Sequence, residues 1–314
     1  MTDPASVTTT TTTTTTTAST SATTAIIVAA GRGRRLGPET AELPKCMVRI
    51  AGRPILHRQM AALAAAGARH FVIVRGYLGE RIVPAPGHDV RFVENPEWAS
   101  NNILTSLMFA EPFMADEFLF SYSDIVFAAD HAHRVASADL AGGGIALVVD
   151  RLWRETYVGR VHHPISEAEL VSVTRAMTKA DGPAREAGGR SLPATVVDRV
   201  GKTVVAADDA VGEFIGLARF SREGAAALRR EWQRARSAPG GLEGPYGRAA
   251  HLRQAYLSDA FNALAAQGEP LTPVFVDGRW REIDTEEDLA RAHGVVDGWD
   301  AGPTDPLATG GLGG

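Results

Sequence analysis

A short apolar run near the start of the chain restricts the possible folds more than any other feature. Residues 25–30 read Ala-Ile-Ile-Val-Ala-Ala and lead directly into Gly31. An unbroken apolar run of this length is typical of a strand buried on both faces, as in a parallel sheet covered by helices. The run therefore predicts an α/β fold with layers on both sides of its first strand.

Helical and strand-like apolar patterns alternate after this run. The predicted strands are residues 70–75, 90–93 and 117–124, and the predicted helices are residues 55–66 and 103–109. This order predicts a doubly wound, mostly parallel sheet of the Rossmann-like kind. Such a sheet binds ligands at the carboxyl ends of its strands.

The second half of the chain is less regular. Strands are predicted at residues 145–150, 213–220 and 273–276, and helices at residues 224–236, 249–266 and 285–292. Thr285 and Asp288 have the spacing of a capping box at the start of the last helix. We interpret the segment that begins at Asp150 as a smaller insert in the main fold.

Both ends of the chain have a composition that does not support a packed core. Residues 1–24 are mostly threonine, without the basic and apolar regions of a signal peptide, and residues 297–314 are rich in glycine and proline. We expect two disordered tails around a single domain at residues 25–296. The apolar runs are shorter than the ~20 residues that a membrane-spanning helix requires.

Charge and cysteine content narrow the class of partners. The formal net charge of -5 argues against a broad basic surface for nucleic acid, but it allows a local cationic site for a small anion. Cys46 is the only cysteine, so an intrachain disulfide or a cluster of thiolate ligands cannot form. We expect a cytoplasmic protein.

The segment after the first strand combines glycine with positive charge. It reads AAGRGRRL at residues 29–36, and a Pro-Lys pair follows at residues 44–45. Gly31 and Gly33 allow backbone N–H groups to approach phosphate oxygens without interference from Cβ atoms. Arg35 and Lys45 supply the positive charge that a polyphosphate requires. The sequence therefore predicts a phosphate-binding loop.

The spacing of this loop excludes two common phosphate-binding motifs. The dinucleotide fingerprint requires a third glycine where Leu36 stands, and an acid at the end of the second strand where Arg75 stands. A P-loop requires Gly-Lys-Ser/Thr at the start of the following helix, and this loop has no such triplet. Phosphate binding remains the interpretation, without either of those folds.

Residues 29–45 resemble the signature of nucleotidyltransferases related to sugar-1-phosphate pyrophosphorylases, L-A-A-G-x-G-x-R-x-x-P-x-T-x-x-x-P-K, with valine replacing the leading leucine. The resemblance continues at residues 52–56, 76–77 and 280–285. It implies a nucleotidyltransferase of the GT-A or Rossmann-like fold. It also implies that Arg35 contacts the outgoing phosphates and Lys45 the reacting α-phosphate, as the catalytic residues. The implied nucleotide-binding residues of the loop are Ala29, Ala30, Gly31 and Gly33.

Two aspartates follow predicted strands on the side where the loop is expected. Asp124 ends one strand, and Asp284 lies between the last strand and the capped helix. An NTP and an anionic acceptor repel each other unless cations neutralise them, and Mg²⁺ held by carboxylates does this. The family resemblance assigns Mg²⁺ binding to Asp124 and Asp284. From the residues alone, a turn at Asp124 and a helix cap at Asp284 remain alternatives.

Residues 94–107 read ENPEWASNNILTSL and resemble an element of CTP-using phosphocholine and phosphonate cytidylyltransferases. The chain has one residue fewer before its Asn-Asn pair and one more after it. The resemblance implies CTP as the nucleotide, with Asn102 and Ser106 as contacts to the base or the ribose. A purely structural helix cap at the Asn-Asn pair remains an alternative.

Residues 150–169 resemble a segment of cytidylyltransferases from phosphonate natural-product pathways. We expect Arg160 and His163 to clamp a phosphonate, or a carboxylate further along the acceptor. Trp153 and Tyr157 lie four residues apart and allow an aromatic contact to a choline-type acceptor instead. Glu213 starts a strand that also resembles the family, and we expect it to contact the acceptor or a metal.

Taken together, these features predict a Mg²⁺-dependent cytidylyltransferase that transfers CMP from CTP to a phosphonate and releases pyrophosphate. The expected partners are CTP and a small phosphonate or phosphate monoester, with neither nucleic acid nor a membrane, and a homodimer is left open. The alternatives are a phosphocholine cytidylyltransferase, a sugar-1-phosphate nucleotidyltransferase and a non-enzymatic nucleotide-binding regulatory module.

Overall fold

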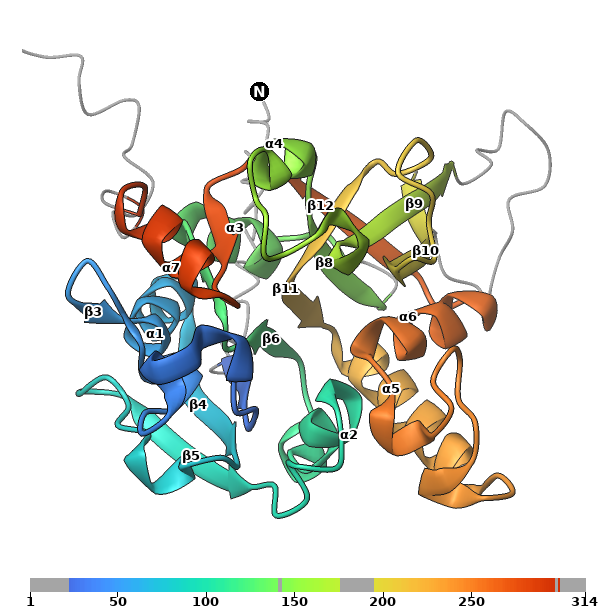
Figure 1. The fold of residues 1–314 in the computed structure, drawn as a ribbon. Helices are drawn as coiled ribbons and strands as arrows, with labels where there is room; N and C mark the ends of the chain where they lie inside the picture. Colours follow the sequence, from blue (N-terminus) through green and yellow to red (C-terminus); the bar gives the residue numbers. More distant parts are fainter. Residues whose placement is uncertain (1–22, 141–142, 176–194, 297–298, 300–314) are drawn as a thin grey trace, which may run out of the picture.

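A mixed sheet forms the centre of the protein. The computed structural model describes residues 23–140, 143–175, 195–296 and 299, and within them nine strands join in one sheet. The main path runs β10–β9–β11–β6–β1–β4–β5, and β8 pairs with β11 and β12 beside it (Figure 1). The strands are β1 (Thr23–Ala29), β4 (Ala68–Arg75), β5 (Asp89–Glu94), β6 (Phe118–Tyr122), β8 (Ile145–Asp150), β9 (Glu169–Arg175), β10 (Thr195–Lys202), β11 (Gly212–Phe220) and β12 (Leu271–Val276).

The two halves of the sheet differ in strand direction. β1 runs parallel to β4 and β6, and β4 runs parallel to β5. β11 runs antiparallel to β6, β8 and β9, and β9 runs antiparallel to β10. The predicted α/β fold with a mostly parallel central sheet is therefore confirmed, and the second half of the chain adds antiparallel strands on one side of it.

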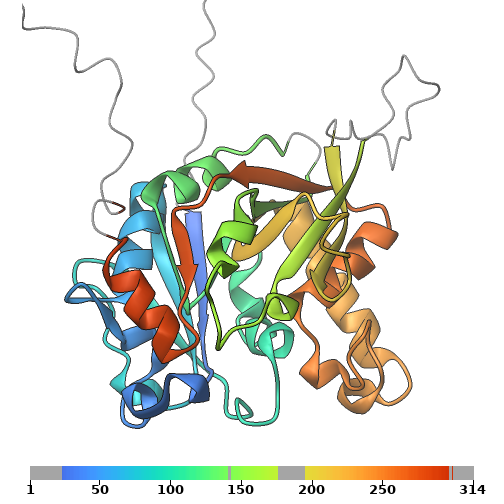
Figure 2. The same cartoon turned by 45° about the horizontal axis from the view of Figure 1, so that its top comes forward.

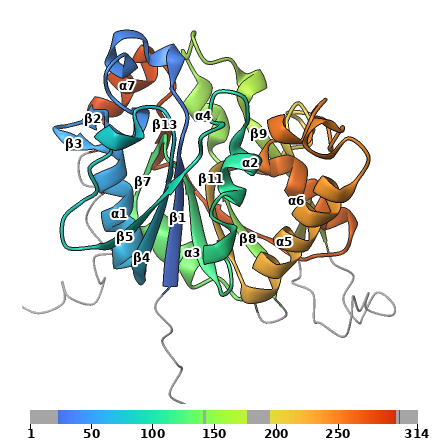
Figure 3. The same cartoon turned by 90° about the horizontal axis from the view of Figure 1, so that it is seen from below.

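Helices cover both faces of the sheet, as the views in Figures 2 and 3 show. Side chains alternate along β1, so Ile27 packs with α1 and α3 on one face, whereas Ile26 packs with α2 and α5 on the other. The helices are α1 (Ile55–Ala65), α2 (Ile103–Met108), α3 (Ala129–Ala136), α4 (Trp153–Tyr157), α5 (Arg222–Ser237), α6 (Leu257–Ala266) and α7 (Glu286–His293). β1 is thus buried on both faces, as its composition predicts.

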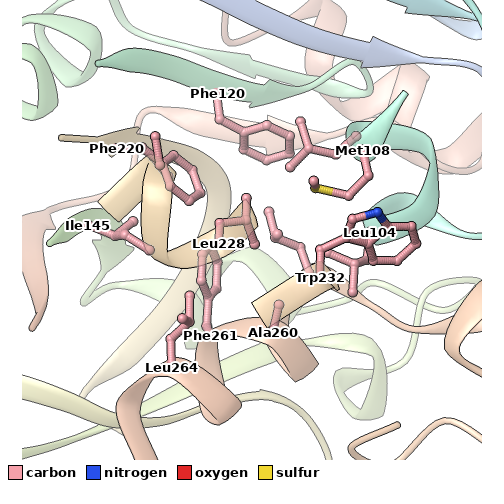
Figure 4. Close-up of a cluster of buried hydrophobic side chains, with 14 of the residues drawn as sticks. Leu104, Met108, Phe120, Ile145, Phe220, Leu228, Trp232, Ala260, Phe261 and Leu264 are labelled. Atoms are coloured by element: carbon pink, nitrogen blue, oxygen red, sulfur yellow. The ribbon is translucent and has the colours of Figure 1, made fainter. Parts of the chain in front are cut away.

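Aromatic side chains fill the larger core between the sheet and α2, α5 and α6. Figure 4 shows Phe120, Phe220, Leu228, Trp232 and Phe261 converging from the sheet and two helices. Each such side chain contributes roughly 2 kcal/mol through removal of apolar surface from water. This packing holds the sheet in place, and the loops at the carboxyl ends of β1 and β6 extend from that sheet.

Two predicted boundaries differ from the structure, and one connection had no prediction. The helix predicted at 249–266 begins only at Leu257, because the backbone at Tyr256 is extended and Asp259 closes a capping box there. A 3₁₀ turn at Gly79–Arg81, and no longer helix, connects β4 and β5 in the described residues. Residues 23 and 24, predicted as part of a tail, belong to β1. The remainder of both predicted tails lies outside the described residues, apart from residue 299.

A small two-stranded sheet follows the strand predicted as the last one. β13 (Trp280–Glu282) pairs antiparallel with β7 (Ile125–Phe127). The backbone N–H of Ile283 then donates to the carbonyl oxygen of Asp124 at 2.8 Å. α7 follows, with the predicted capping box formed by Thr285 and Asp288. This pairing places the loop after β13 beside the loop after β6.

No helix in the described ranges has the length and apolar character needed to cross a bilayer.

Candidate active site

A cavity of about 370 Å³ opens where the carboxyl ends of β1 and β6 meet the loop after β13. Its volume is usual for a site that takes a small molecule. Elements from both halves of the sheet form its wall. The predicted site residues that line it are Ala30, Gly31, Gly33, Arg35, Lys45, Asn102, Ser106, Asp124, Glu213 and Asp284. Ala29, also predicted, lies in β1 and packs in the core beneath the loop.

Gly31 and Gly33 are required for different physical reasons. A Cβ atom added at Gly31 would meet no described atom within 4 Å, so it would stand in the cavity. A Cβ atom added at Gly33 would lie 2.9 Å from Cδ of Lys45, and Gly33 has a φ of +65°. Gly33 therefore lets the Lys45 side chain pass over the loop, whereas Gly31 leaves space for a ligand.

Other residues of the motif hold this loop in place. The hydroxyl of Thr40 donates to the carbonyl oxygen of Gly33 at 2.9 Å, and the N–H of Tyr77 donates to that of Ala30 at 3.0 Å. A Cβ atom at Gly76 would lie 2.6 Å from Cβ of Trp98. The conformation of the glycine loop thus depends on Thr40 and on the segments that follow β4 and β5.

Lys45 lies between the two predicted metal-binding aspartates. Its Nζ donates to Oδ2 of Asp124 at 2.8 Å and also to Oδ1 of Asp284. Arg35 donates to Oδ2 of Asp284. The side chains of Lys45 and Asp284 are each 9% exposed, whereas Arg35 is half-exposed at the mouth. The structure therefore brings these four predicted residues together at one wall of the cavity.

Burial and charge oppose each other in this cluster. Burial alone would lower the pKa of the Lys45 ammonium, but Asp124 and Asp284 hold it above its ordinary value. Burial would raise the pKa of Asp284, but Lys45 and Arg35 hold it well below the usual range. Lys45 is therefore cationic and Asp284 anionic at neutral pH.

The carboxylates around Lys45 fit a hard divalent cation. Oδ1 of Asp124 is buried and has no hydrogen-bond partner among the described residues, and Glu282 adds a third carboxyl group to the cavity wall. Burial, together with Asp284 and Asp124, raises the pKa of Glu282 well above its ordinary value. Carboxylate oxygens are the ligands that Mg²⁺ prefers. Glu282 and Asp284 offer carboxylate oxygens that lie within 4.8 Å of each other and of a ring nitrogen of His163. Asp124 adds a further carboxylate to the same cavity wall, and these acids are suited to hold the ion.

The Asn-Asn pair and Ser106 line the cavity beside the N-terminus of α2. Oδ1 of Asn102 accepts from the N–H of Ile103 at 2.8 Å, so Asn102 does cap α2. Ser106 donates to Oδ1 of Asn101 at 3.1 Å and accepts from Nδ2 of Asn95 at 2.9 Å. Asn95 and Asn101 also exchange hydrogen bonds at 3.0 Å. Asn95, Asn101 and Ser106 form a polar network, of which sequence reasoning identified Ser106. Asn102, also predicted, caps the helix beside this network.

Four residues expected at the acceptor lie behind the cavity wall in the described structure. Nε of Arg160 donates to Oδ1 of Asp288 at 2.6 Å, and this guanidinium is 2% exposed. His163 is fully buried, with Nε2 3.2 Å from Oε2 of Glu282. The reason for this placement is electrostatic: both side chains are enclosed with the acids of the β13–α7 loop.

Neither aromatic residue of the same segment lines the cavity. Trp153 is buried in a small cluster with Leu170 and Val205, so it is not part of an aromatic cage at the site. Tyr157 packs edge-on against Trp153, with ring centroids 6.2 Å apart. Its hydroxyl donates to Oε1 of Glu213 at 2.7 Å. Tyr157 therefore supports a cavity residue from behind.

Sequence reasoning missed the residues on the side of the cavity opposite the glycine loop. Lys202, at the end of β10, donates to Oε2 of Glu167 at 2.8 Å and lies 5.1 Å from the ring centroid of Tyr256. Glu169 accepts from the hydroxyl of Tyr122 at 3.1 Å. All five residues line the cavity. The signal was weak, because Lys202 stands in a Gly-Lys-Thr triplet that ends a strand rather than opening a helix.

The chain is similar in sequence to known cytidylyltransferases. The chain is 26% identical to the CTP:phosphoglutamine cytidylyltransferase of Campylobacter jejuni over 269 residues, which cover 83% of this chain and 95% of that protein. It is 33% identical to the CMP-5'-(3-aminopropyl)phosphonate synthase of Streptomyces rubellomurinus over 115 residues, or 35% of this chain and 18% of that protein.

The fold is shared with solved structures. The inositol-1-phosphate CTP transferase from T. maritima superposes with a TM-score of 0.65 at 20% identity, covering 90% of this chain and 98% of that one. The family model for the MobA-like NTP transferase domain matches residues 25–199, more than half of the 314 residues. With the glycine loop, Lys45 and the paired aspartates at one cavity, the chain belongs to the MobA-like NTP transferase family.

Proposed function

We propose that this protein transfers CMP from CTP to a small phosphonate or phosphate monoester and releases pyrophosphate. The observation that carries the proposal is the meeting of the glycine loop, Lys45, Asp124 and Asp284 at one cavity. In this cavity, basic side chains and carboxylates suited to a metal ion lie beside a glycine loop whose backbone N–H groups are accessible. An NTP requires this arrangement for its phosphates. The cytidylyl part of the proposal rests on the relatives named for CTP chemistry and on the Asn-Asn segment.

The nucleotide would lie with its phosphates over the glycine loop. Gly31 leaves space for a phosphate oxygen, and Arg35 at the mouth is placed for the outgoing β- and γ-phosphates. Lys45 would exchange its carboxylate partners for the α-phosphate, where negative charge accumulates during transfer. The base would lie on the side of Asn102 and Ser106.

Bound Mg²⁺ would neutralise part of the triphosphate charge, held by Asp124, Glu282 and Asp284. The chain's own residues then position the reactants. An oxygen of the acceptor attacks the α-phosphorus, a new P–O bond forms, and the bond to the bridging oxygen breaks. Pyrophosphate leaves with that electron pair. The acceptor oxygen is already anionic near neutral pH, so we assign no general base, and catalysis rests on positioning and charge.

We propose that the acceptor's phosphorus group binds near Lys202. Burial alone would lower the pKa of Lys202, but Glu167 holds it above its ordinary value, so the side chain is cationic. It faces the cavity from β10, across from the glycine loop. This lysine takes the role that the sequence assigned to Arg160 and His163, whose side chains are enclosed behind the wall.

Arg160 would act through Asp284 instead of touching the acceptor. Asp288 accepts from Arg160 and, through Oδ2, from the backbone N–H groups of Asp284 at 3.1 Å and Thr285 at 2.9 Å. The insert therefore buttresses the loop that carries Asp284. We propose Arg160 and Asp288 as positioning residues for that carboxylate.

A screen of pyrophosphate release tests the proposal. Purified protein with Mg²⁺ would be given CTP, UTP or dTTP, each with 2-aminoethylphosphonate, 2-hydroxyethylphosphonate, phosphocholine or glucose-1-phosphate. We expect release with CTP and at least one phosphonate, which would also support a role in phosphonate biosynthesis. Turnover confined to UTP or dTTP with glucose-1-phosphate would contradict it and favour a sugar-1-phosphate nucleotidyltransferase. Nucleotide binding without release under any combination would favour a regulatory module.

A further inference from the structure

Three adjacent strands carry a row of ionisable side chains along the acceptor side of the cavity. Lys202 on β10 is the register partner of Glu169 on β9, and Leu170 of β9 is the register partner of Glu213 on β11. Lys202, Glu169 and Glu213 all line the cavity. Lys202 therefore shares one face of the sheet with Glu169, whereas Glu213 lies on the face of Leu170. At the ends of these strands both faces reach the cavity, which receives one ammonium group and two carboxyl groups from them.

Glu213 has an oxygen that the protein leaves without a partner. Its Oε1 accepts from the hydroxyl of Tyr157 at 2.7 Å, but Oε2 is buried and has no hydrogen-bond partner among the described residues. The residue as a whole is 3% exposed. Burying a carboxyl oxygen without a donor is costly, so such an atom at a cavity wall indicates a ligand that supplies one.

Glu169 differs from Glu213 in this respect. Its Oε2 accepts from the hydroxyl of Tyr122 at 3.1 Å, and its Oε1 accepts from the hydroxyl of Ser258 at 3.0 Å. Glu167 is paired with Lys202. Of the three glutamates on this side of the cavity, Glu213 is thus the one with a buried oxygen that lacks a donor in the described residues.

The balance of charge on this side favours a ligand that carries a positive group. Glu167, Glu169 and Glu213 stand against Lys202, whereas an acceptor phosphonate brings further negative charge. Burial raises the pKa of Glu213 to about 8, although the hydroxyl of Tyr157 and the charge of Arg160 oppose this shift. A bound ammonium group would favour the carboxylate form of Glu213, whereas a second anionic group on the acceptor would oppose it.

We propose that the acceptor is a zwitterion whose protonated primary amine binds Glu213 while its phosphorus group lies toward Lys202. The proposal rests on the proposed cytidylyl transfer for the identity of the acceptor's other end. It assigns Glu213 as the residue that selects amino-phosphonates or amino-phosphates over hydroxyl analogues.

The chemistry of the partner follows from the missing donor. A primary ammonium supplies N–H donors and positive charge together, so its bond to a carboxylate is among the stronger hydrogen bonds. A hydroxyl supplies a donor without charge. A quaternary ammonium supplies charge without a donor, and it is best held by aromatic faces. Trp153 and Tyr157, the aromatic residues expected for such a contact, are not among the residues that line the cavity.

Direct binding separates these acceptors. Isothermal titration of the full-length protein with Mg²⁺ would compare 2-aminoethylphosphonate, 2-hydroxyethylphosphonate and phosphocholine. We expect the amine to bind about 100-fold more tightly than the hydroxyl analogue, since a buried charge pair discriminates to that degree. Equal affinity for the amine and the hydroxyl, or tighter binding of phosphocholine, would overturn the proposal.

A pair of variants tests the residue. Glu213→Gln keeps the shape of the side chain and an oxygen that can accept from the hydroxyl of Tyr157, but it removes the charge. The ratio of the affinities for the amine and the hydroxyl analogue should therefore fall to about 5-fold or less. The matched control is Asp198→Asn on β10, whose carboxylate accepts from Ser172 at 2.7 Å outside the cavity. It should keep the wild-type preference. An unchanged preference in Glu213→Gln, with a wild-type circular dichroism spectrum, would overturn the assignment.

Turnover separates this inference from the proposed function. Selective binding of the amine without pyrophosphate release from CTP would contradict cytidylyl transfer and leave the amine subsite intact. Release from CTP with equal kcat/KM for the amine and the hydroxyl would support the transfer and overturn the subsite. Both properties together would support both.

Discussion

Nζ of Lys45 lies 2.8 Å from Oδ2 of Asp124, although 79 residues separate them in the chain. The same ammonium also contacts Asp284, so one cation holds two carboxylates that belong to different loops. Without a cation between them, the carboxylates of Asp124 and Asp284 would repel each other. Lys45 therefore stabilises the site before substrate arrives. Under the proposed function it would contact a phosphate once substrate and Mg²⁺ replace it as the partners of these acids.

Replacing Lys45 with alanine should abolish most of the turnover. Removing a cation at the site of transition-state charge costs roughly 10³-fold in kcat. It also leaves Asp124 and Asp284 facing each other, which should destabilise the fold by about 3 kcal/mol. Pyrophosphate release and urea denaturation measure the two effects.

Added Mg²⁺ should restore more stability to Lys45→Ala than to the wild type, because it replaces the missing positive charge. Wild-type pyrophosphate release by the purified variant would refute the role of Lys45.

Alanine at Gly31 should weaken nucleotide binding while leaving stability unchanged. The added Cβ meets no described protein atom within 4 Å and enters the cavity. We expect the KM for CTP to rise about 10-fold, as the loss of one charge-assisted phosphate contact implies. Gly33→Ala is the comparison, since its Cβ would collide with Lys45 and its φ is positive. That variant should lose stability as well, by about 1 kcal/mol. A lower melting temperature for Gly31→Ala than for Gly33→Ala would contradict this assignment.

Asp288→Asn should lower kcat more than loss of the helix cap alone would do. The carboxylate both closes the capping box of α7 and binds Arg160, so its replacement should release the loop that carries Asp284. Thr285→Ala removes the cap, at about 1 kcal/mol, but keeps the bond between Asp288 and Arg160. We expect kcat to fall about 10-fold further in Asp288→Asn, with KM for CTP little changed, because a misplaced carboxylate affects the transition state. Equal kcat values for the two variants would show that Asp288 acts only as the cap of α7.

The stability of the protein should depend on Glu213 between about pH 5 and pH 8. Burial raises the pKa of this carboxyl from 4.5 to about 8, with Asp150 and Glu169 adding to the effect and Tyr157 and Arg160 opposing it. In this window the folded state holds a proton that the unfolded state has released. The free energy of unfolding therefore falls as pH rises, as far as Glu213 contributes. Glu213→Gln removes this contribution.

Urea denaturation across that pH range tests the expectation. The free energy of unfolding of Glu213→Gln should decline less with rising pH than that of the wild type. The two curves should converge near the acidic end, where the wild-type carboxyl is protonated in both states. Parallel curves over the whole range would show that Glu213 titrates normally in the folded protein.

The sequence by itself determined the first half of the fold and the cation side of the site. An apolar run followed by Gly31 and Gly33 has few stable solutions, because a strand buried on both faces must be covered and a glycine turn must follow it. The acids at 124 and 284 were also identifiable, since each follows a strand at the edge where a doubly wound sheet binds ligands. Local sequence patterns carry this information, so these features can be predicted from the sequence alone.

Only the tertiary structure decided what Arg160, His163 and Lys202 do. As a residue type near a predicted acceptor, Arg160 suggested a clamp, yet its guanidinium is enclosed with Asp288 from a segment more than a hundred residues later. Lys202 gave no clear signal, because its importance comes from the register of β10 with β9. Whether a charged side chain faces a ligand or another charge depends on which distant strands become neighbours. Long-range pairing sets that, and periodicity within a segment does not encode it.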